Sequence, residues 1–297
     1  MKENRYIRFD WAMKRLLRHK ADHSVLEGFL TSLLNHPIKV LKLLESEGNQ
    51  EYAENKYNRV DILAESADGE KMLIEVQNES EDAYFHRMLF GTSKLVTEYL
   101  RRGDNYERIS KIYSINIVYF NLGVGNDYVY RGKTEFRGIH TNEILTLPER
   151  FKEKYNISEV SDIYPEYYVL RADEFDKWSS TPLDQWMYFL STSQIPDDAN
   201  APGLKEAKEQ LRIDSLSEEE KNAYYAHLDN MVSMRSIVDD ARDEGIWVGM
   251  RKGFQQGMEQ GALNKLRHSV QNMRKNGFDD ATIANLLGES PDLIASI

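Results

Sequence analysis

Two acidic residues stand inside strongly apolar segments that lie close together in the sequence. Asp61 belongs to Asn58-Arg-Val-Asp-Ile-Leu, and Glu75 belongs to Met72-Leu-Ile-Glu-Val-Gln. A carboxylate among buried neighbours is costly unless it is paired, hydrogen-bonded or bound to a cation. Two carboxylates on neighbouring strands also repel each other unless a positive charge lies between them. Such a pair, with a nearby carbonyl oxygen, offers the hard oxygen ligands that suit Mg²⁺.

β-Strands must position these acids. The segments Arg59–Ala64 and Lys71–Gln77 are strongly apolar, and the Asp68-Gly69 pair between them is a turn signal. The pattern therefore predicts a hairpin whose two strands each carry one of the acids.

The length of the hairpin loop decides whether the acids meet. Opposite residues of an antiparallel pair share one face, so a loop with an odd number of residues places Asp61, Glu75 and Gln77 together. Their Cβ atoms would then lie roughly 5–8 Å apart. A two-residue loop would instead pair Asp61 with Val76 and separate the carboxylates.

The remaining chain supplies helices and further strands around this hairpin. Helical spacing of apolar residues predicts helices at Phe9–Arg18, Asp22–Leu34 and Asp82–Arg101. Apolar and aromatic runs predict strands at Tyr113–Phe120, Tyr128–His140 and Glu166–Leu170. This order favours an α/β or α+β fold, a mixed sheet with helices on its faces.

Composition limits the classes of protein that this chain can be. It has 297 residues, 41% of them hydrophobic, which is enough for a substantial core, and a net charge of −11. The net charge excludes a uniformly basic nucleic-acid coat. The absence of cysteine excludes disulfides, thiolate metal sites and cysteine nucleophiles. The charged N-terminus and the lack of a long apolar run predict a soluble, cytoplasmic protein with no membrane partner.

The distribution of charge predicts how the chain is organised. Residues 41–82 and 141–243 are acidic, whereas 1–40 and 83–140 are basic. This alternation fits metal-binding carboxylates beside phosphate-holding cations, and it also fits ordinary surface scatter. The change in pattern along the chain predicts three parts, at residues 1–172, 173–243 and 244–297.

The last part contains glycines repeated every four residues. They are Gly245, Gly249, Gly253, Gly257 and Gly261. A glycine inside a helix costs about 1 kcal/mol relative to alanine, so five in register need a reason. Such a row allows close approach of a second helix or subunit, and a frayed linker is the alternative. The pattern of residues 273–297 predicts a small helical hairpin. A DNA-binding helix-turn-helix is the alternative for this segment.

Five motifs in order carry a family resemblance. They are FDWAMKRLL near the start, LEGFL from Leu26, NRVDIL, IEVQNE and YFHRMLFGTSK. Together they resemble the Rpn family of recombination-promoting nucleases and transposases, within the PD-(D/E)XK nuclease superfamily. The resemblance implies a PD-(D/E)XK restriction-endonuclease-like mixed sheet flanked by helices, with a helical C-terminal extension.

The resemblance also implies roles for particular residues. Asp61 and Glu75 would be metal ligands for Mg²⁺ or Mn²⁺, and the carbonyl of Val76 would supply a third oxygen. Gln77 occupies the position where the wider superfamily has a catalytic lysine. Gln is neutral and can only hydrogen-bond, whereas Lys can also offset transition-state charge. Glu27 is a candidate extra acid from the first helical region, or a solvated helix residue.

Other charged residues have weaker assignments. His86, Arg87 and Lys94 lie on the helix after Glu75, where they would hold phosphate or form an ordinary helix surface. Asp10 is expected to do no more than pair with Lys14 one helical turn away.

Two functions from different classes follow. The first is a Mg²⁺-dependent DNA endonuclease, linked by the resemblance to recombination or mobile-element activity. The second is a catalytically weak or inactive nuclease-fold module that binds DNA or protein as an oligomer. The Asp61–Glu75 pair favours the enzyme, and Gln77 with the acidic bulk favours the binding module. In both cases DNA is an expected partner, and the glycine row predicts a homo-oligomer.

Overall fold

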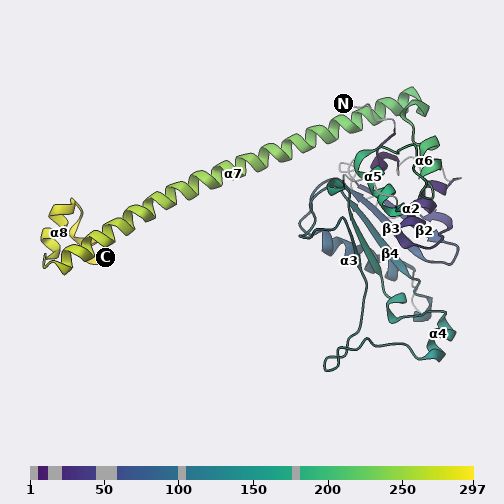
Figure 1. Cartoon of the computed structure of the whole chain (residues 1–297), viewed down its shortest axis with the longest axis horizontal. Coiled ribbons are helices and arrows are strands. Elements are labelled where there is room, and N and C mark those ends of the chain that lie inside the picture. The colour runs from purple at the N-terminus through teal and green to yellow at the C-terminus, as the bar shows by residue number, and fades with distance from the viewer. Residues whose placement is uncertain (1–5, 13–21, 45–58, 100–104, 176–180) are drawn as a thin grey trace. The chain divides into compact units, whose positions relative to one another are not determined.

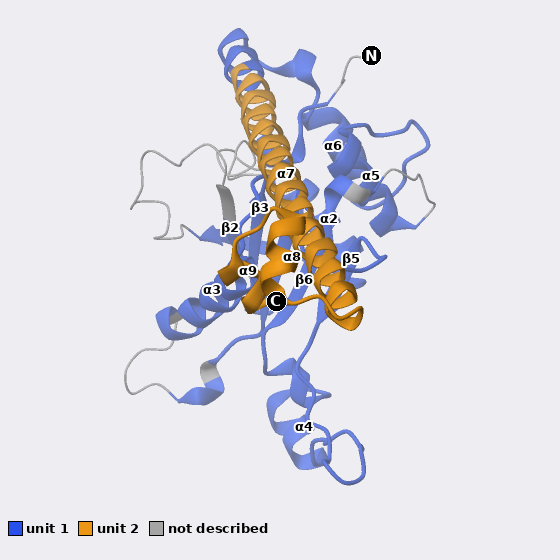
Figure 2. Cartoon of the chain, turned by 90° about the vertical axis from the view of Figure 1, so that its left-hand side faces the viewer, with its two compact units in different colours: residues 1–225 blue, residues 226–297 orange. Residues whose placement is uncertain are grey.

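The structure is a computed structural model that describes residues 6–12, 22–44, 59–99, 105–175 and 181–297. The chain divides into two compact units, residues 1–225 and 226–297 (Figure 2). The predicted three-part division of the chain stays a prediction.

The first unit is built on a six-stranded mixed sheet. Its strands are β1 Val40–Leu44, β2 Arg59–Ser66, β3 Lys71–Gln77, β4 Ile112–Val118, β5 Val129–Gly132 and β6 Glu166–Arg171. Their order across the sheet is β1-β2-β3-β4-β6-β5. The β1–β2, β2–β3 and β5–β6 pairs are antiparallel, whereas β3–β4 and β4–β6 are parallel. The mixed α/β sheet that the sequence predicts is therefore confirmed.

The two central strands explain why their sequences are apolar along their whole length. Every residue of β3 and β4 is buried, because helices lie on both sides of the sheet (Figure 1). A parallel pair cannot be joined by a tight turn, so the chain crosses over between β3 and β4 through a helix. That helix is α3, Tyr84–Tyr99, and it packs Leu95 against Leu73 and Ile112 of one sheet face.

Three further helices lie on the other side of the sheet (Figure 1). They are α2 Ser24–Leu34, α5 Pro182–Thr192 and α6 Leu204–Gln210. The predicted helix at Phe9–Arg18 is described only at residues 9–12, which are helical, and its remainder lies outside the described residues. Aromatic rings join these elements, since Phe9, Phe29 and Trp186 have centroids 5.4–6.0 Å apart.

Helices α2 and α6 approach so closely that two glycines are needed where they meet. A Cβ added at Gly28 would lie 2.3 Å from the Cα of Gly203, which is closer than real Cβ atoms approach. Gly203 also has φ +79°, in the left-handed region where glycine is favoured. Segments 175 residues apart in sequence are thereby locked into one core.

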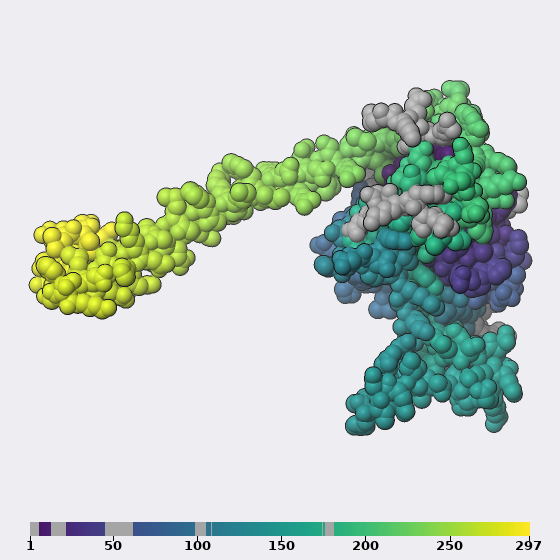
Figure 3. Space-filling model, viewed as in Figure 1, coloured from purple at the N-terminus to yellow at the C-terminus, as the bar shows by residue number. Residues whose placement is uncertain are grey.

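An arm of residues 133–165 extends from the sheet between β5 and β6, and it carries the short helix α4 Glu149–Tyr155 (Figures 1 and 3). The sequence predicts a strand from Tyr128 to His140. A strand lies there, but its predicted extent is wrong, because β5 ends at Gly132. Gly132 pairs with Tyr167, the second residue of β6, so the following residues have almost no strand left to pair with.

The second unit contains most of α7, Glu218–Lys275, followed by α8 Asp280–Leu287 and α9 Pro291–Ser296. The start of α7 is a capping box, in which Glu220 N–H donates to the Ser217 hydroxyl and Ser217 N–H donates to the Glu220 carboxylate. A small core of Val270, Ile283, Ala284 and Ile294 holds α7, α8 and α9 together. Among the described residues, every helix is too short or too polar to span a bilayer.

The repeated glycines all lie inside α7 with ordinary helical backbone. Within this unit, a Cβ added at any of the five meets no atom within 4 Å. The folding of the unit alone therefore does not explain why glycine stands at these positions.

Candidate active site

The hairpin register brings the two predicted acids together. Asp61 pairs directly with Glu75, and Glu65 pairs with Lys71 at the closed end of the hairpin. Ser66 N–H donates to the Glu70 carbonyl, which leaves three residues in the loop. Of the two loop lengths that the sequence left open, the structure has the odd one, and the positions of Asp61 and Glu75 share one face of the sheet. The side chain of Asp61 lies outside the described part of the chain.

Glu75 is a buried carboxylate with a cation beside it. It is 5% exposed, and Arg87 of α3 donates from Nε to its Oε2 at 3.0 Å. The same guanidinium lies 3.6 Å from the carboxylate of Glu81. A buried carboxylate requires such compensation. Of the three residues assigned to phosphate, Arg87 therefore lies against Glu75, as its counter-ion.

A glycine lets α3 approach this carboxylate closely. A Cβ added at Gly91 would lie 3.1 Å from the side chain of Leu73 and 3.6 Å from Oε1 of Glu75. The first distance is tighter than most real contacts of a Cβ atom, so a larger residue would require the Leu73 side chain to shift by a few tenths of an ångström. The glycine in the YFHRMLFGTSK motif thus has a steric reason.

The next strand adds a buried amide beside Glu75. Asn116 of β4 pairs with Glu75 and is fully buried. The hydroxyl of Tyr84 donates to its Oδ1 at 3.2 Å, and its Nδ2 donates to Ser114 Oγ and to the Tyr168 carbonyl. These bonds fix the amide that neighbours the carboxylate.

Gln77 lies two residues beyond Glu75, on the same face, and is 4% exposed. Its Nε2 donates to the carbonyl of Glu79 at 3.3 Å. The bond holds the amide at the end of β3, next to the loop that leads to α3. The amide lies in the position that the sequence predicts for it.

An acid that the sequence analysis underrated lies at this end of the sheet. Asp10 is 1% exposed and bonds to residues beyond its own helix, so the expectation that it does no more than pair with Lys14 is wrong; Lys14 itself lies outside the described residues. Its Oδ2 accepts from Asn78 Nδ2 at 3.1 Å, and its Oδ1 accepts from Arg8 Nε at 3.2 Å. Asn78 directly follows Gln77, so a residue near the start of the chain is bonded to the end of β3. No spacing rule in the sequence connects positions that far apart.

Arg8 completes this cluster. Its Nη2 donates to Asn78 Oδ1 at 3.3 Å, and its guanidinium lies 4.8 Å from the centre of the Tyr119 ring. Burial raises the pKa of the Tyr119 hydroxyl, which donates to the Leu190 carbonyl at 2.9 Å. Arg8 thus lies beside Asp10, at the same end of β3 as Gln77.

Glu27, the candidate extra acid, lies away from Asp61 and Glu75. Its carboxylate accepts from Lys39 Nζ at 2.8 Å and from the Val40 N–H at 2.9 Å, which ties α2 to the start of β1. Val40 pairs with Ser66, five residues along β2 from Asp61, or roughly 16 Å at the usual strand rise. The structure therefore does not bring Glu27 to the paired acids.

His86 and Lys94 are exposed residues of α3. They lie on the helix that supplies Arg87, but they are exposed whereas Glu75 is buried. Their assignment to phosphate stays a prediction.

A divalent cation such as Mg²⁺ requires several hard oxygen donors around one point. Among the described side chains, no group of three or more His, Asp or Glu is placed to hold a metal. The backbone register nevertheless sets the positions of two acids, Asp61 and Glu75, opposite each other. Carboxylate oxygens with the Val76 carbonyl are the hard donors that Mg²⁺ and Mn²⁺ accept. The types of oxygen donor that Asp61, Glu75 and Val76 offer therefore suit such a cation.

Comparison with known proteins gives one match. Neither the curated proteins nor the solved structures contain a match to the chain. A family model described as PD-(D/E)XK nuclease family transposase matches residues 7–241, which include all six strands and the residues around Glu75. The chain therefore belongs to the PD-(D/E)XK nuclease family of transposases.

Proposed function

We infer that this protein is a Mg²⁺-dependent DNA endonuclease acting in recombination or in the movement of a mobile element. Membership of the family supports a nuclease or mobile-element role. The observation that carries the finer proposal is the direct pairing of Asp61 with Glu75 on one face of the sheet.

Each residue of the site has a part in this reaction. Asp61, Glu75 and the Val76 carbonyl would hold the cation, which supplies a polarised water and offsets charge on the phosphate. Arg87 fixes Glu75 through the bond to Oε2. Gln77, held at the end of β3, would orient the attacking water by hydrogen bonding.

A plasmid-nicking assay with Mg²⁺ tests the proposal. Wild type should nick and Asp61→Ala should not, because one of two paired metal ligands is lost. Asp68→Ala is the matched control, since Asp68 is an exposed acid in the turn of the same hairpin. Equal nicking by wild type and Asp61→Ala would contradict the assignment.

The alternative is a nuclease-fold module that binds DNA or protein without turnover. Two observations favour it: Arg87 already neutralises Glu75, and the Gln77 amide is bonded to the Glu79 carbonyl. A wild type that binds DNA but leaves plasmid intact with both Mg²⁺ and Mn²⁺ would establish this alternative.

We also propose that α7 makes the protein a homo-oligomer. Exposed apolar residues flank the glycine row on this helix: Ile246, Trp247, Met250, Phe254 and Met258. The five glycines cost about 4–5 kcal/mol of helix propensity, which packing against a second copy would offset. Two copies would bring together two sites, as cleavage of both strands of a duplex requires.

A further inference from the structure

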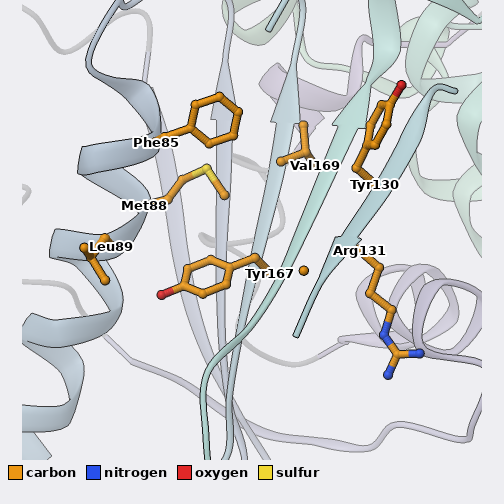
Figure 4. Close-up of a pocket in the computed structure, with 8 residues that line it drawn as sticks. Phe85, Met88, Leu89, Tyr130, Arg131, Tyr167 and Val169 are labelled. Atoms are coloured by element: carbon orange, nitrogen blue, oxygen red, sulfur yellow. The ribbon is translucent and has the colours of Figure 1, made fainter. Parts of the chain in front are cut away.

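An open groove lies between α3 and the β5–β6 edge of the sheet (Figure 4). Its volume is about 410 Å³, which is in the range of small-molecule sites. Apolar and aromatic side chains dominate its lining: Phe85, Met88, Leu89, Tyr130, Tyr167 and Val169. We call it the aromatic groove. The rings of Phe85 and Tyr130 are accessible, since these residues are 55% and 37% exposed.

The aromatic groove lies on the same sheet face as the paired acids. Glu75 pairs with Asn116, Asn116 with Val169, and Val169 with Tyr130, so these four residues form one row across four strands. At about 4.8 Å between strands, Val169 lies roughly 10 Å from Glu75. A single strand that stays stacked covers that distance in about three nucleotides. The separation between the acids and the groove therefore equals the length of a short stretch of one strand.

Hydrogen bonds fix two of the rings by their edges. The hydroxyls of Tyr167 and Thr92 lie 2.8 Å apart, and the Asp127 N–H donates to the Tyr130 hydroxyl at 2.9 Å. A Cβ at Gly125 would lie 2.0 Å from that same hydroxyl, so glycine is needed to seat it. Rings that are already fixed lose little conformational entropy when a ligand stacks on them.

The chemistry of the lining favours a flat, largely apolar ligand. Bases stack on aromatic side chains with little regard to sequence, because every base has a π-face. At the rim, the side chain of Arg131 is 57% exposed and is held by Glu166 at 2.5 Å. A cation at the rim of an apolar groove suits a ligand that joins a flat ring to a phosphate.

We propose that the aromatic groove stacks an unpaired nucleobase of the strand whose phosphate lies at Asp61 and Glu75. The inference rests on the proposed nuclease function and adds a substrate class to it, single-stranded or locally unpaired DNA. In an intact duplex a base is stacked on its neighbours and reaches such a groove only after being flipped out.

Binding of oligonucleotides tests this inference without cleavage. Fluorescence anisotropy in EDTA would compare a single strand of about 12 nucleotides with a strand of equal length and charge that carries abasic sites throughout. The full-length wild type should bind the base-bearing strand at least about fivefold more tightly, the effect of one stacked base. Phe85→Ala should lose this preference, and Phe85→Trp should keep it.

Tyr106→Ala is the control, because Tyr106 is a 79% exposed aromatic residue near the amino end of β4. It should bind like wild type. The inference is overturned if wild type does not prefer bases, or if Phe85→Ala keeps the preference. A change in sedimentation mass for Phe85→Ala would assign the groove to contact between protein chains and overturn it as well. Nicking of plasmid by wild type but not by Asp61→Ala would leave the nuclease proposal standing in each of these cases.

Discussion

Glu75 carries a buried negative charge that two kinds of cation can balance, the Arg87 guanidinium and a divalent metal. Arg87 binds one carboxylate oxygen of Glu75 and also lies near Glu81. The position of Asp61 lies directly opposite Glu75 on the neighbouring strand. If both acids bind a divalent cation, as proposed above, an added metal should stabilise the folded protein.

Thermal unfolding with and without Mn²⁺ measures this effect. At about 100 times the dissociation constant, the metal should add about 2.7 kcal/mol to the free energy of unfolding of wild type. Glu75→Gln should show no such shift, whereas Glu81→Gln should keep it. Equal shifts in wild type and Glu75→Gln would remove Glu75 from the metal site.

Gln77 makes a second prediction at this scale. If its amide orients water, Gln77→Ala should lower the nicking rate by about 10²-fold, the usual cost of one positioned donor. The Mn²⁺ shift in thermal unfolding should stay near that of wild type. Gln77→Lys should retain activity or raise it, because a cation offsets charge on the phosphate. An unchanged rate in Gln77→Ala would reduce Gln77 to a structural residue of β3.

The residue scale also shows what a sequence leaves out. The pairing of Asp61 with Glu75 was one of two alternatives that the sequence left open, because it depends on the length of the hairpin loop. The bond between Asp10 and Asn78 joins residues 68 positions apart and depends on packing that spacing cannot reveal. The ion pair between Arg87 and Glu75 could not be predicted either, because the sequence does not show which face of α3 packs against the sheet.

At the scale of elements, two helical glycines in different surroundings allow a matched comparison. Gly28 faces Gly203 at a distance that leaves no room for a methyl group, whereas a Cβ at Gly245 in the second unit meets no atom within 4 Å. Gly28→Ala should lower the free energy of unfolding by about 1–3 kcal/mol through overpacking. At a protein concentration low enough to keep the chain monomeric, Gly245→Ala should not lower it, since alanine favours the helix by about 1 kcal/mol. Urea unfolding measures both, and a loss in both variants would contradict the steric explanation.

The start of β6 predicts a dependence of stability on pH. Burial alone would raise the pKa of Glu166, but bonds from Arg131, Tyr168 and Lys111 outweigh burial and lower that pKa below the ordinary value of 4.5. A lowered folded pKa means that the stabilisation is present above about pH 4.5 and is lost as the pH falls through the folded pKa. Glu166→Gln should therefore flatten the fall in urea midpoint below pH 4.5.

Glu149→Gln is the control for this titration, because Glu149 is an exposed acid of α4. Its urea midpoint should follow the pH dependence of wild type. If the urea midpoint falls equally for Glu166→Gln and for wild type, the loss of stability at low pH arises from other carboxylates.

The bounds of helices and strands were predictable where the local sequence alone determines them. The bounds of β3 match the predicted Lys71–Gln77, because a continuous apolar run follows a turn at Gly69, which has φ +82°. The strand at Tyr128 was predicted eight residues too long, because its end depends on where β6 begins. The aromatic groove was not predicted, since its walls come from α3, β5 and β6.

At the scale of the whole molecule, the glycine row of α7 predicts the oligomeric state. The row spans about 24 Å at 1.5 Å per residue, with exposed apolar residues beside it. The full-length protein should sediment as a dimer or larger. A chain truncated after Asp240 should be a monomer with impaired double-strand cleavage.

A second variant separates close packing from helix formation. Gly249→Leu with Gly253→Leu strengthens the helix but fills the row with bulky side chains. It should weaken association if a second copy packs against the glycines. A wild type that stays monomeric at tens of micromolar would contradict self-association through α7.

The connectivity of the sheet has a consequence for the order in which the chain folds. Asp61 and Glu75 are separated by 14 residues in sequence and meet through a hairpin, a contact that forms within microseconds. Gly28 and Gly203 meet only after a loop of 175 residues has closed, and contacts at such sequence separation slow folding. We therefore expect the two acids to come into register before the surrounding core is complete, so their mutual repulsion acts on the folding chain before α3 brings Arg87 to them.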